Sequence, residues 1–350
     1  MMPEFVFEIA NNHWGSVDRG IEIIKTYSQI ARYENIKAAI KLQFRHVPSF
    51  IHKNYLNSDL RYIKKTIETA LTKDQFEELV LTIKKGGCIP KTTCFDETTV
   101  QWAQDLGIEI LKIASSDIND WSLIERMAQT RLPIIASTGG SSRKDIEDLV
   151  IFCMHRNIPL SLNHCIALYP TPPSDLNLHE IDVLRQLYPA NIIGLSTHEA
   201  PLSNESIQIA YAKGARTFER HVDIPYLQNE HPVSLYCSLP DEIVGWIEAW
   251  KRAKILCGTP NRVITEKETQ YLDSLVRGMY AKRDLEYGDE LTGDNIYYAI
   301  PLQRGQLSCR EVQIINQRLI HPIKQDAPIM IDHINCSVEG LVDKIKTRGL

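Results

Sequence analysis

The chain has 350 residues, with 39 Lys and Arg against 44 Asp and Glu, and a net charge of −5. Nucleic-acid-binding proteins usually carry a basic surplus instead. No apolar run approaches the roughly 18–20 residues of a membrane span, and the N-terminus lacks a secretory signal. The eight cysteines are far apart without a CxxC motif, which is typical of reduced thiols. We expect a cytoplasmic protein with no nucleic-acid or membrane partner.

Short apolar segments alternate with segments of helical length through most of the chain. Val17–Ile30, Lys73–Lys85 and Ser142–His155 have the apolar spacing of amphipathic helices. Eight segments have the character of buried strands: Phe5–Ile9, Ala38–Leu42, Cys88–Thr93, Ile108–Ile113, Pro133–Ser137, Pro159–Asn163, Ile192–Ser196 and Arg216–Arg220. Eight such repeats predict an α/β fold, a (β/α)₈ TIM barrel. An open doubly wound sheet is the alternative, but no GxGxxG follows the first strand.

The composition changes near Cys257, which predicts a second domain. We expect a barrel domain over 1–258, a polar linker over 259–272, a small domain over 273–337 and a C-terminal tail over 338–350 that is a solvated helix or an extended tail. Tyr280–Ile296 and Ile320–Ile334 resemble each other weakly, as two half-units of strand and turn would. A domain of this size buries little surface by itself, so we expect it to be stabilised by packing against a partner surface.

Nearly every predicted strand ends in a polar or titratable side chain. In a (β/α)₈ barrel the active site lies at these C-terminal strand ends. Lys41 and Lys112 stand among apolar residues, where an unpaired ammonium is costly. Lysines and hydroxyls together suit phosphate or carboxylate groups, and the turn after Ser137 adds backbone N–H donors at a helix start. The hydroxyl residues of this predicted anion pocket are Thr93, Ser115, Ser137 and Ser196. Each serine alone is equally suited to cap a helix.

Three further titratable residues follow the first, seventh and eighth predicted strands. His198 and His221 end adjacent strands, and two imidazoles can hold a divalent metal while leaving room for water and substrate. Two histidines taken alone more often make structural hydrogen bonds. Glu8 ends an otherwise apolar strand and is a candidate general base or metal partner.

Seven segments resemble, in order, the motifs of the sialic acid synthase family. They are Glu8–Ser16, Lys41–Gln43, Leu111–Ser115, Pro133–Gly139, His164–Pro172, Ile193–His198 and Phe218–His221. The region from Val276 to Ile296 resembles that family's antifreeze-like SAF domain, a β-clip fold. The resemblance implies a (β/α)₈ barrel followed by an SAF domain, in a homodimer whose SAF domain caps the partner's barrel.

The resemblance also implies a reaction and a set of site residues. Phosphoenolpyruvate condenses with an open-chain N-acylhexosamine, giving a nonulosonic acid and phosphate by C–O cleavage, as in surface polysaccharide biosynthesis. Glu8, Lys41 and Lys112 would be catalytic, and His198 and His221 would bind Mn²⁺ or Mg²⁺. Phosphoenolpyruvate would contact Lys41, Thr93, Lys112, Ser115, Ser137 and Ser196. The sugar would contact Asn12, Gln43, Asp117, Tyr169, Ser234 and Arg304.

Three departures from the family pattern fall on the sugar side. Ala167 replaces an asparagine, Ser234 replaces an acidic residue, and Ile300 replaces an arginine that reaches the partner's site. Arg304, four residues later, is the candidate substitute for that arginine. Because the loss of hydrogen-bond partners changes substrate selectivity, we expect an altered sugar acceptor.

Two other functions fit the same residues. Lys41 or Lys112 could form a Schiff base, which would make the protein a metal-independent aldolase. Alternatively, a catalytically inactive barrel could serve assembly or carbohydrate binding through its SAF domain. The retention of Glu8, both lysines and both histidines favours an enzyme.

Overall fold

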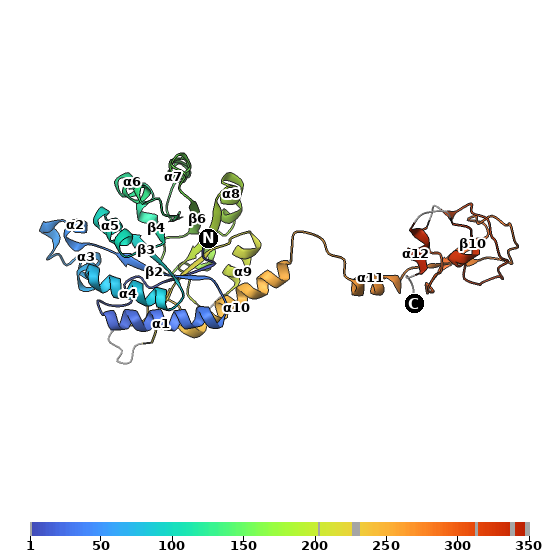
Figure 1. Cartoon of the computed structure of the whole chain (residues 1–350), viewed down its shortest axis with the longest axis horizontal. Coiled ribbons are helices and arrows are strands. Elements are labelled where there is room, and N and C mark those ends of the chain that lie inside the picture. Colours follow the sequence, from blue (N-terminus) through green and yellow to red (C-terminus); the bar gives the residue numbers. More distant parts are fainter. Residues whose placement is uncertain (1, 202–203, 226–231, 312–313, 337–339, 347–350) are drawn as a thin grey trace. The chain divides into compact units, whose positions relative to one another are not determined.

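The structure is a computed structural model that describes residues 2–201, 204–225, 232–311, 314–336 and 340–346. The chain forms two compact units, Met1–Gly258 and Thr259–Leu350 (Figure 1). None of the helices in these described ranges combines the length and apolarity needed to cross a bilayer.

The first unit is a closed barrel of eight parallel strands, which confirms the predicted (β/α)₈ fold. Closure comes from β1 pairing with β8, where Phe5 lies opposite Phe218 and Glu8 opposite His221. Each observed strand overlaps its predicted segment. The strands are β1 (Phe5–Glu8), β2 (Ala38–Phe44), β3 (Ile89–Cys94), β4 (Ile110–Ile113), β5 (Ile134–Ser137), β6 (Leu160–Cys165), β7 (Ile192–Thr197) and β8 (Phe218–His221).

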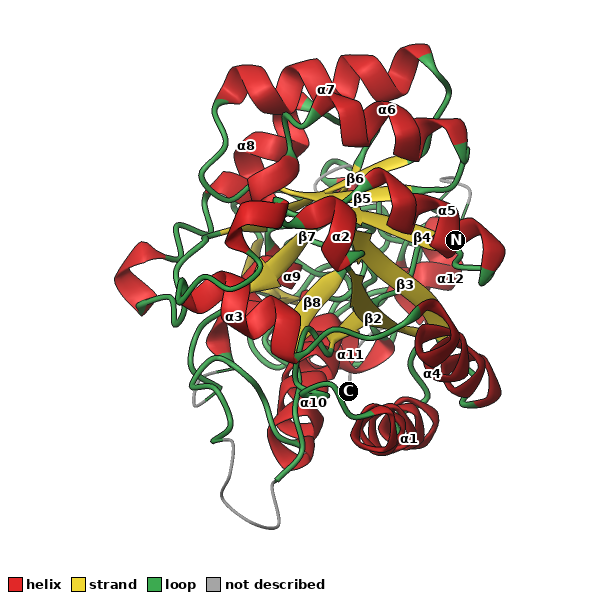
Figure 2. Cartoon of the chain, turned by 90° about the vertical axis from the view of Figure 1, so that its left-hand side faces the viewer, coloured by secondary structure: helices red, strands yellow, loops and turns green. Residues whose placement is uncertain are grey.

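Helices surround the strands, as Figure 2 shows. They are α1 (Val17–Tyr33), α2 (Val47–Phe50), α3 (Arg61–Glu68), α4 (Lys73–Lys85), α5 (Glu97–Asp105), α6 (Trp121–Gln129), α7 (Arg143–His155), α8 (Glu180–Leu187), α9 (Glu205–Ala212) and α10 (Pro240–Cys257). Helix α4 has the predicted bounds because Thr72 and Gln75 form a capping box at its start. Helix α7 begins one residue later than predicted, since Ser142 is its N-cap. The fit of both helices follows from signals that are local in the sequence.

The apolar core of the barrel unit lies between the strands and the helices. Phe5 packs edge-on against Trp246 and Trp250 of α10, with ring centroids 5.6 and 5.2 Å apart. The opposite, inner face of the strands carries buried polar side chains at the C-terminal ends, among them Lys41 and Glu219. The barrel therefore separates a packing layer outside from a polar layer inside.

The second unit has its own small core around β9 (Gly278–Ala281) and β10 (Ile296–Ala299), which pair in antiparallel fashion. The two similar segments predicted from the sequence pair with each other. Leu285 of the first and Ile323 of the second exchange two backbone hydrogen bonds of 2.8 Å, and both side chains are buried. The assignment of this unit as an SAF domain stays a prediction.

Two short helices depart from the expected organisation. Helix α11 (Glu266–Asp273) occupies the second half of the segment expected to be a linker, starting where Thr265 accepts from the Glu268 N–H. Helix α12 (Leu341–Lys346) lies in the expected tail, but Ile345 is fully buried in the core of the second unit. The segment thus forms a helix, one of the two expected forms, but the buried Ile345 means that this helix is not solvated on all sides. Its high lysine content concealed an apolar face of Leu341, Val342 and Ile345.

Candidate active site

A cavity of about 200 Å³ opens at the C-terminal ends of the barrel strands. Pockets for drug-sized ligands usually exceed roughly 300 Å³, so this one suits a small ligand. Eleven predicted site residues line it: Glu8, Lys41, Gln43, Thr93, Lys112, Ser115, Ser137, Tyr169, Ser196, His198 and His221. The tertiary structure thus brings most of the predicted residues into one place.

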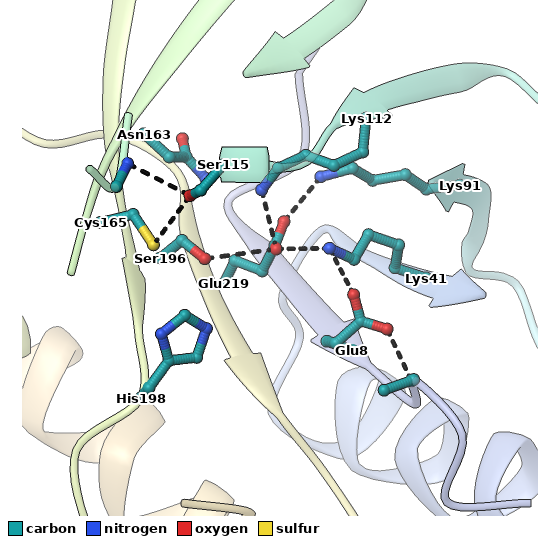
Figure 3. Close-up of polar contacts among 12 residues, drawn as sticks. Glu8, Lys41, Lys91, Lys112, Ser115, Asn163, Cys165, Ser196, His198 and Glu219 are labelled. Carbon is teal, nitrogen blue, oxygen red and sulfur yellow. Dashed lines mark hydrogen bonds and ion pairs between the residues drawn. The ribbon is translucent and has the colours of Figure 1, made fainter. Parts of the chain in front are cut away.

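Three buried lysines converge on the carboxylate of Glu219 (Figure 3). Its Oε1 lies 2.6 Å from Lys41 Nζ and 2.9 Å from Lys112 Nζ, while its Oε2 lies 2.8 Å from Lys91 Nζ. Lys41 also forms an ion pair with Glu8. We call these five residues the lysine cluster. Parallel pairing of β1, β2, β3 and β4 on one side, and of β8 with β1, brings them together from distant parts of the chain.

The lysine cluster brings three lysines together with two carboxylates, and burial lowers the pKa of Lys41 well below its usual value against the attraction of Glu219. Burial raises the pKa of Glu219, but attraction to Lys112, Lys41 and Lys91 outweighs it and holds the pKa well below its usual value. Burial lowers the pKa of Lys91 to about 8 against the attraction of Glu219. A small anion can therefore compete with Glu219 for the lysines that line the cavity.

The serines of the predicted anion pocket lie on the other side of Lys112. Ser115 Oγ accepts from the Gly139 N–H at 3.1 Å and lies 3.6 Å from Cys165 Sγ. A Cβ at Gly139 would come within 2.7 Å of Ser115 Oγ, so a larger residue at this turn would displace the Ser115 hydroxyl. Ser196 Oγ donates to Glu219 at 3.3 Å, which joins the serines to the lysine cluster.

His198 and His221 face each other with ring centroids 5.2 Å apart. The ring of Tyr169 lies 4.0 Å from that of His198, and Tyr236 lies 5.2 Å from His221. His198 Nδ1 is 2.9 Å from the carbonyl oxygen of Ile166, which leaves its Nε2 available. His221 Nδ1 is buried with no hydrogen-bond partner among the described residues.

The two imidazoles fit a divalent metal in their chemistry. Burial lowers the pKa of His198 to about 4 and that of His221 well below its usual value, so both rings are neutral, as metal ligands must be. In the described ranges, no three His, Cys, Asp or Glu residues lie close enough to hold a metal together. A metal held by these two rings would take its remaining ligands from substrate or water.

Four residues predicted on the sugar side are not brought into this cavity. Asn12 Nδ2 donates to the Val222 carbonyl at 2.8 Å, so its amide holds the chain after β8. Asp117 and Ser234 do not line the cavity, and Arg304 belongs to the second unit, where its Nε donates to the Lys346 carbonyl at 3.3 Å. For Asn12 the alternative partner was invisible in sequence, since Val222 is 210 positions away.

Three residues of the site were not identified from the sequence as functional. Lys91 stands inside a predicted strand, two positions before Thr93 and therefore on the same face, which is the signal that could have found it. Arg45 follows Gln43 by the same step and lines the cavity. Glu219 lies near the end of the predicted strand Arg216–Arg220, but its role as the shared partner of three lysines depends on barrel closure.

Acidification should destabilise the metal-free protein below the usual histidine range. Imidazole in an unfolded chain binds a proton near pH 6.5, whereas the buried His198 stays neutral to about pH 4. Unfolding therefore takes up a proton between these values, so stability falls as pH decreases from 6.5 toward 4 and is unaffected by this group above 6.5. Urea unfolding at pH 7.5 and pH 5 measures this loss.

Two variants distinguish the contribution of His198 from the effect of low pH on the stability of the rest of the protein. His198→Gln should lose less stability between the two pH values than the wild type. His155→Gln, on the exposed end of α7, should keep the wild-type pH dependence. Equal pH dependence in His198→Gln and the wild type would show that His198 is not neutral in the folded state.

Comparison with known proteins places the chain in a family. Residues 31–259 match the model of the NeuB family. A solved structure from Chromobacterium violaceum, of a spore coat polysaccharide biosynthesis protein E, is 38% identical with a TM-score of 0.91, covering 96% of this chain and 100% of that one. N-acetylneuraminate-9-phosphate synthase of Mus musculus is 23% identical over 98% of this chain and 95% of its own.

Pseudaminic acid synthase of Helicobacter pylori is also similar, being 26% identical over 70% of this chain and 71% of its own. These relatives agree with the sialic acid synthase motifs found in the sequence. Because the family match covers well over half of the 350 residues, the chain belongs to the NeuB family.

Proposed function

We propose that the protein is a phosphoenolpyruvate-dependent synthase that acts on an open-chain hexosamine. The products would be a nonulosonic acid and inorganic phosphate. The observation that carries this proposal is the single cavity in which Lys41 and Lys112 lie beside His198 and His221. The names of the relatives, which include N-acetylneuraminate-9-phosphate and pseudaminic acid synthases, support the same reaction class.

Phosphoenolpyruvate would bind by taking over the donors that Glu219 Oε1 now uses. Lys41 and Lys112 already point their ammonium groups at one acceptor, 2.6 and 2.9 Å away. Hydroxyls of Thr93, Ser115, Ser137 and Ser196 line the same cavity and add neutral donors. Donors that are oriented before the substrate arrives need little reorganisation as charge moves, which favours the transition state.

A divalent ion, Mn²⁺ or Mg²⁺, would be held by His198 and His221 and would polarise the sugar aldehyde as a Lewis acid. The methylene carbon of phosphoenolpyruvate would form the new bond to the aldehyde carbon. Water would then add at C2, one of its protons passing to the former aldehyde oxygen. The other proton would leave as C2 becomes a carbonyl and phosphate departs with the bridging oxygen. Glu8, anchored by the Ala10 N–H at 2.6 Å and by Lys41, would accept the proton of that water.

The decisive experiment supplies phosphoenolpyruvate, Mn²⁺ and a panel of open-chain hexosamines, and measures phosphate release. Substrate carrying ¹⁸O in the bridging position should deliver the label to inorganic phosphate, because the C–O bond breaks. Label retained in the sugar acid would contradict this chemistry. If the folded protein released no phosphate with any hexosamine of the panel, the result would favour the non-catalytic alternative.

The Schiff-base alternative has its own signature. Borohydride reduction in the presence of pyruvate should trap a covalent adduct on Lys41 or Lys112 only if the protein is an aldolase of that kind. We expect no adduct, because both ammonium groups are engaged in ion pairs with Glu219.

We also propose a homodimer in which the second unit, as an SAF domain, completes the partner's barrel through Arg304. The family resemblance supports this arrangement, and Arg304, four residues after Ile300, is the candidate for the arginine that position 300 lacks. Mixing His221→Ala protein with Arg304→Ala protein should then restore activity. In such a heterodimer, the Arg304→Ala chain contributes an intact barrel and the His221→Ala chain contributes an intact Arg304 to it. No recovery after verified subunit exchange would argue that each chain works alone.

A further inference from the structure

Arg45 brings a second cationic group to the cavity, away from the lysine cluster. Lys41, Gln43 and Arg45 alternate along β2 and its C-terminal end, and all three line the cavity. Strands advance about 3.3 Å per residue, so the Cα atom of Arg45 lies roughly 13 Å beyond that of Lys41 toward the mouth. The cavity therefore has a positive charge at its outer end as well as at its floor.

Neutral partners hold the Arg45 guanidinium in place. It lies 3.9 Å from the centroid of the Phe95 ring, with the Phe50 and Tyr62 rings about 6 Å away. One terminal nitrogen donates to Gln43 Oε1 at 2.7 Å and the other to Asn11 Oδ1 at 3.2 Å. The guanidinium plane is thus fixed before any ligand binds.

The charge of Arg45 has no carboxylate partner of its own. Two other arginines of the barrel unit do, since the partly buried Arg19 pairs with Asp223 at 2.7 Å and the buried Arg220 pairs with Glu199 at 3.3 Å. No ion pair within 4.0 Å joins Arg45 to an acidic residue in the part of the chain that the structure describes. Its Nε is buried and has no hydrogen-bond partner there.

Neighbouring groups do not replace the missing ion-pair partner of Arg45. Asp96 and Asp117 attract the guanidinium from a greater distance, and Tyr62 hydrogen-bonds to it. The oxygens of Asp96 already accept from the backbone N–H groups of His46 and Thr99. The Phe95 ring stabilises the cation through its electron-rich face, but it has no oxygen or nitrogen that could accept a hydrogen bond from the Nε–H group. A partly buried cation whose Nε is covered without a hydrogen-bond partner among the described residues is costly unless a ligand completes its surroundings.

We propose that Arg45 binds an anionic group, a phosphate or a carboxylate, on the sugar acceptor. This inference rests on the proposed function, because the acceptor aldehyde must meet phosphoenolpyruvate at the inner end of the cavity. The far end of the open sugar chain then points toward the mouth, where Arg45 lies. The acceptor would be a negatively charged hexosamine, and a planar guanidinium suits both kinds of anion.

The test compares acceptors that differ only at the end distal from the aldehyde. Matched hexosamines with a neutral hydroxymethyl, a phosphate or a carboxylate at that position are assayed for phosphate release from phosphoenolpyruvate. The wild type should prefer one anionic acceptor over the neutral one by at least tenfold in kcat/KM. The two anionic arms distinguish phosphate from carboxylate.

The Arg45→Met variant should raise KM for that anionic acceptor about 10–100-fold, the factor expected for a lost charge-assisted hydrogen bond. Any change in KM for phosphoenolpyruvate should be much smaller. Arg45→Lys keeps the charge and should retain part of the preference, and it covers the case in which Arg45→Met fails to fold. Arg156→Met is the matched control, since Arg156 stacks on Phe152 at 3.8 Å on the surface.

The outcomes separate this inference from the proposed function. Turnover with a preference for the neutral acceptor would overturn the role of Arg45 and leave the synthase reaction standing. Equal rises in KM for both substrates in Arg45→Met would show that the residue only supports the fold of the cavity. Absence of turnover with every acceptor would count against both proposals.

Discussion

Replacing Glu219 with Gln should lower the free energy of unfolding by about 3–5 kcal/mol, the usual cost of leaving a buried charge unpaired. Glu219 is the ion-pair partner of Lys41, Lys91 and Lys112, all of them almost fully buried. The amide is nearly isosteric but neutral, so three buried ammonium groups would share only the carboxylate of Glu8. Urea unfolding at pH 7.5 measures the change.

Two further variants make this expectation specific. Glu125→Gln breaks a half-exposed pair with Arg156 and should cost no more than about 1 kcal/mol. Adding Lys91→Met to Glu219→Gln should recover part of the loss, because Lys91 pairs with Glu219 alone among the described carboxylates. A Glu219→Gln protein as stable as the Glu125→Gln control would show that the cluster is not charged in the folded state.

Inorganic phosphate offers a related measurement on the same variant. If the lysine cluster binds anions, phosphate should stabilise Glu219→Gln more than the wild type, since it no longer competes with the internal carboxylate. An equal shift in melting temperature for both proteins would place the anion elsewhere.

Replacing His221 with Ala should abolish metal-dependent turnover. Among the described residues, the proposed metal site has two imidazole ligands, so the loss of one leaves a single protein ligand. Removing a residue that only hydrogen-bonds to a metal ligand already lowers metal affinity up to roughly 100-fold, so Mn²⁺ affinity should fall at least that much. Calorimetric titration of Mn²⁺ in the presence of phosphoenolpyruvate reports binding independently of activity. Phosphate release reports turnover in the same samples.

A surface histidine provides the control for this experiment. His179 has a side chain that is 83% exposed, and His179→Ala should bind Mn²⁺ and turn over as the wild type does. Unchanged turnover in His221→Ala would remove His221 from the site. Lost turnover with unchanged Mn²⁺ binding would mean that His221 acts on the substrate without holding the metal.

Local patterns in the sequence determined the barrel and much of its mouth. A strand buried on both faces reads as an apolar run, and β2 or β7 could be found on that basis. A polar residue directly after such a run must lie at the C-terminal end of the barrel, as His198 does after β7. Those inferences need only strand period and strand direction, both of which are local properties.

Only the tertiary structure decided which charges share a partner and which stay unpaired. Lys41 and Glu219 are 178 positions apart, and their pairing exists because the barrel closes between β1 and β8. Nothing in the sequence around Arg45 or Arg19 indicates which of them has an acidic partner. In the fold, Arg19 pairs with Asp223, whereas no carboxylate of the described residues lies within ion-pair distance of Arg45. Charge compensation acts through space across strands that are distant in the chain, so residue spacing along the sequence carries no record of it.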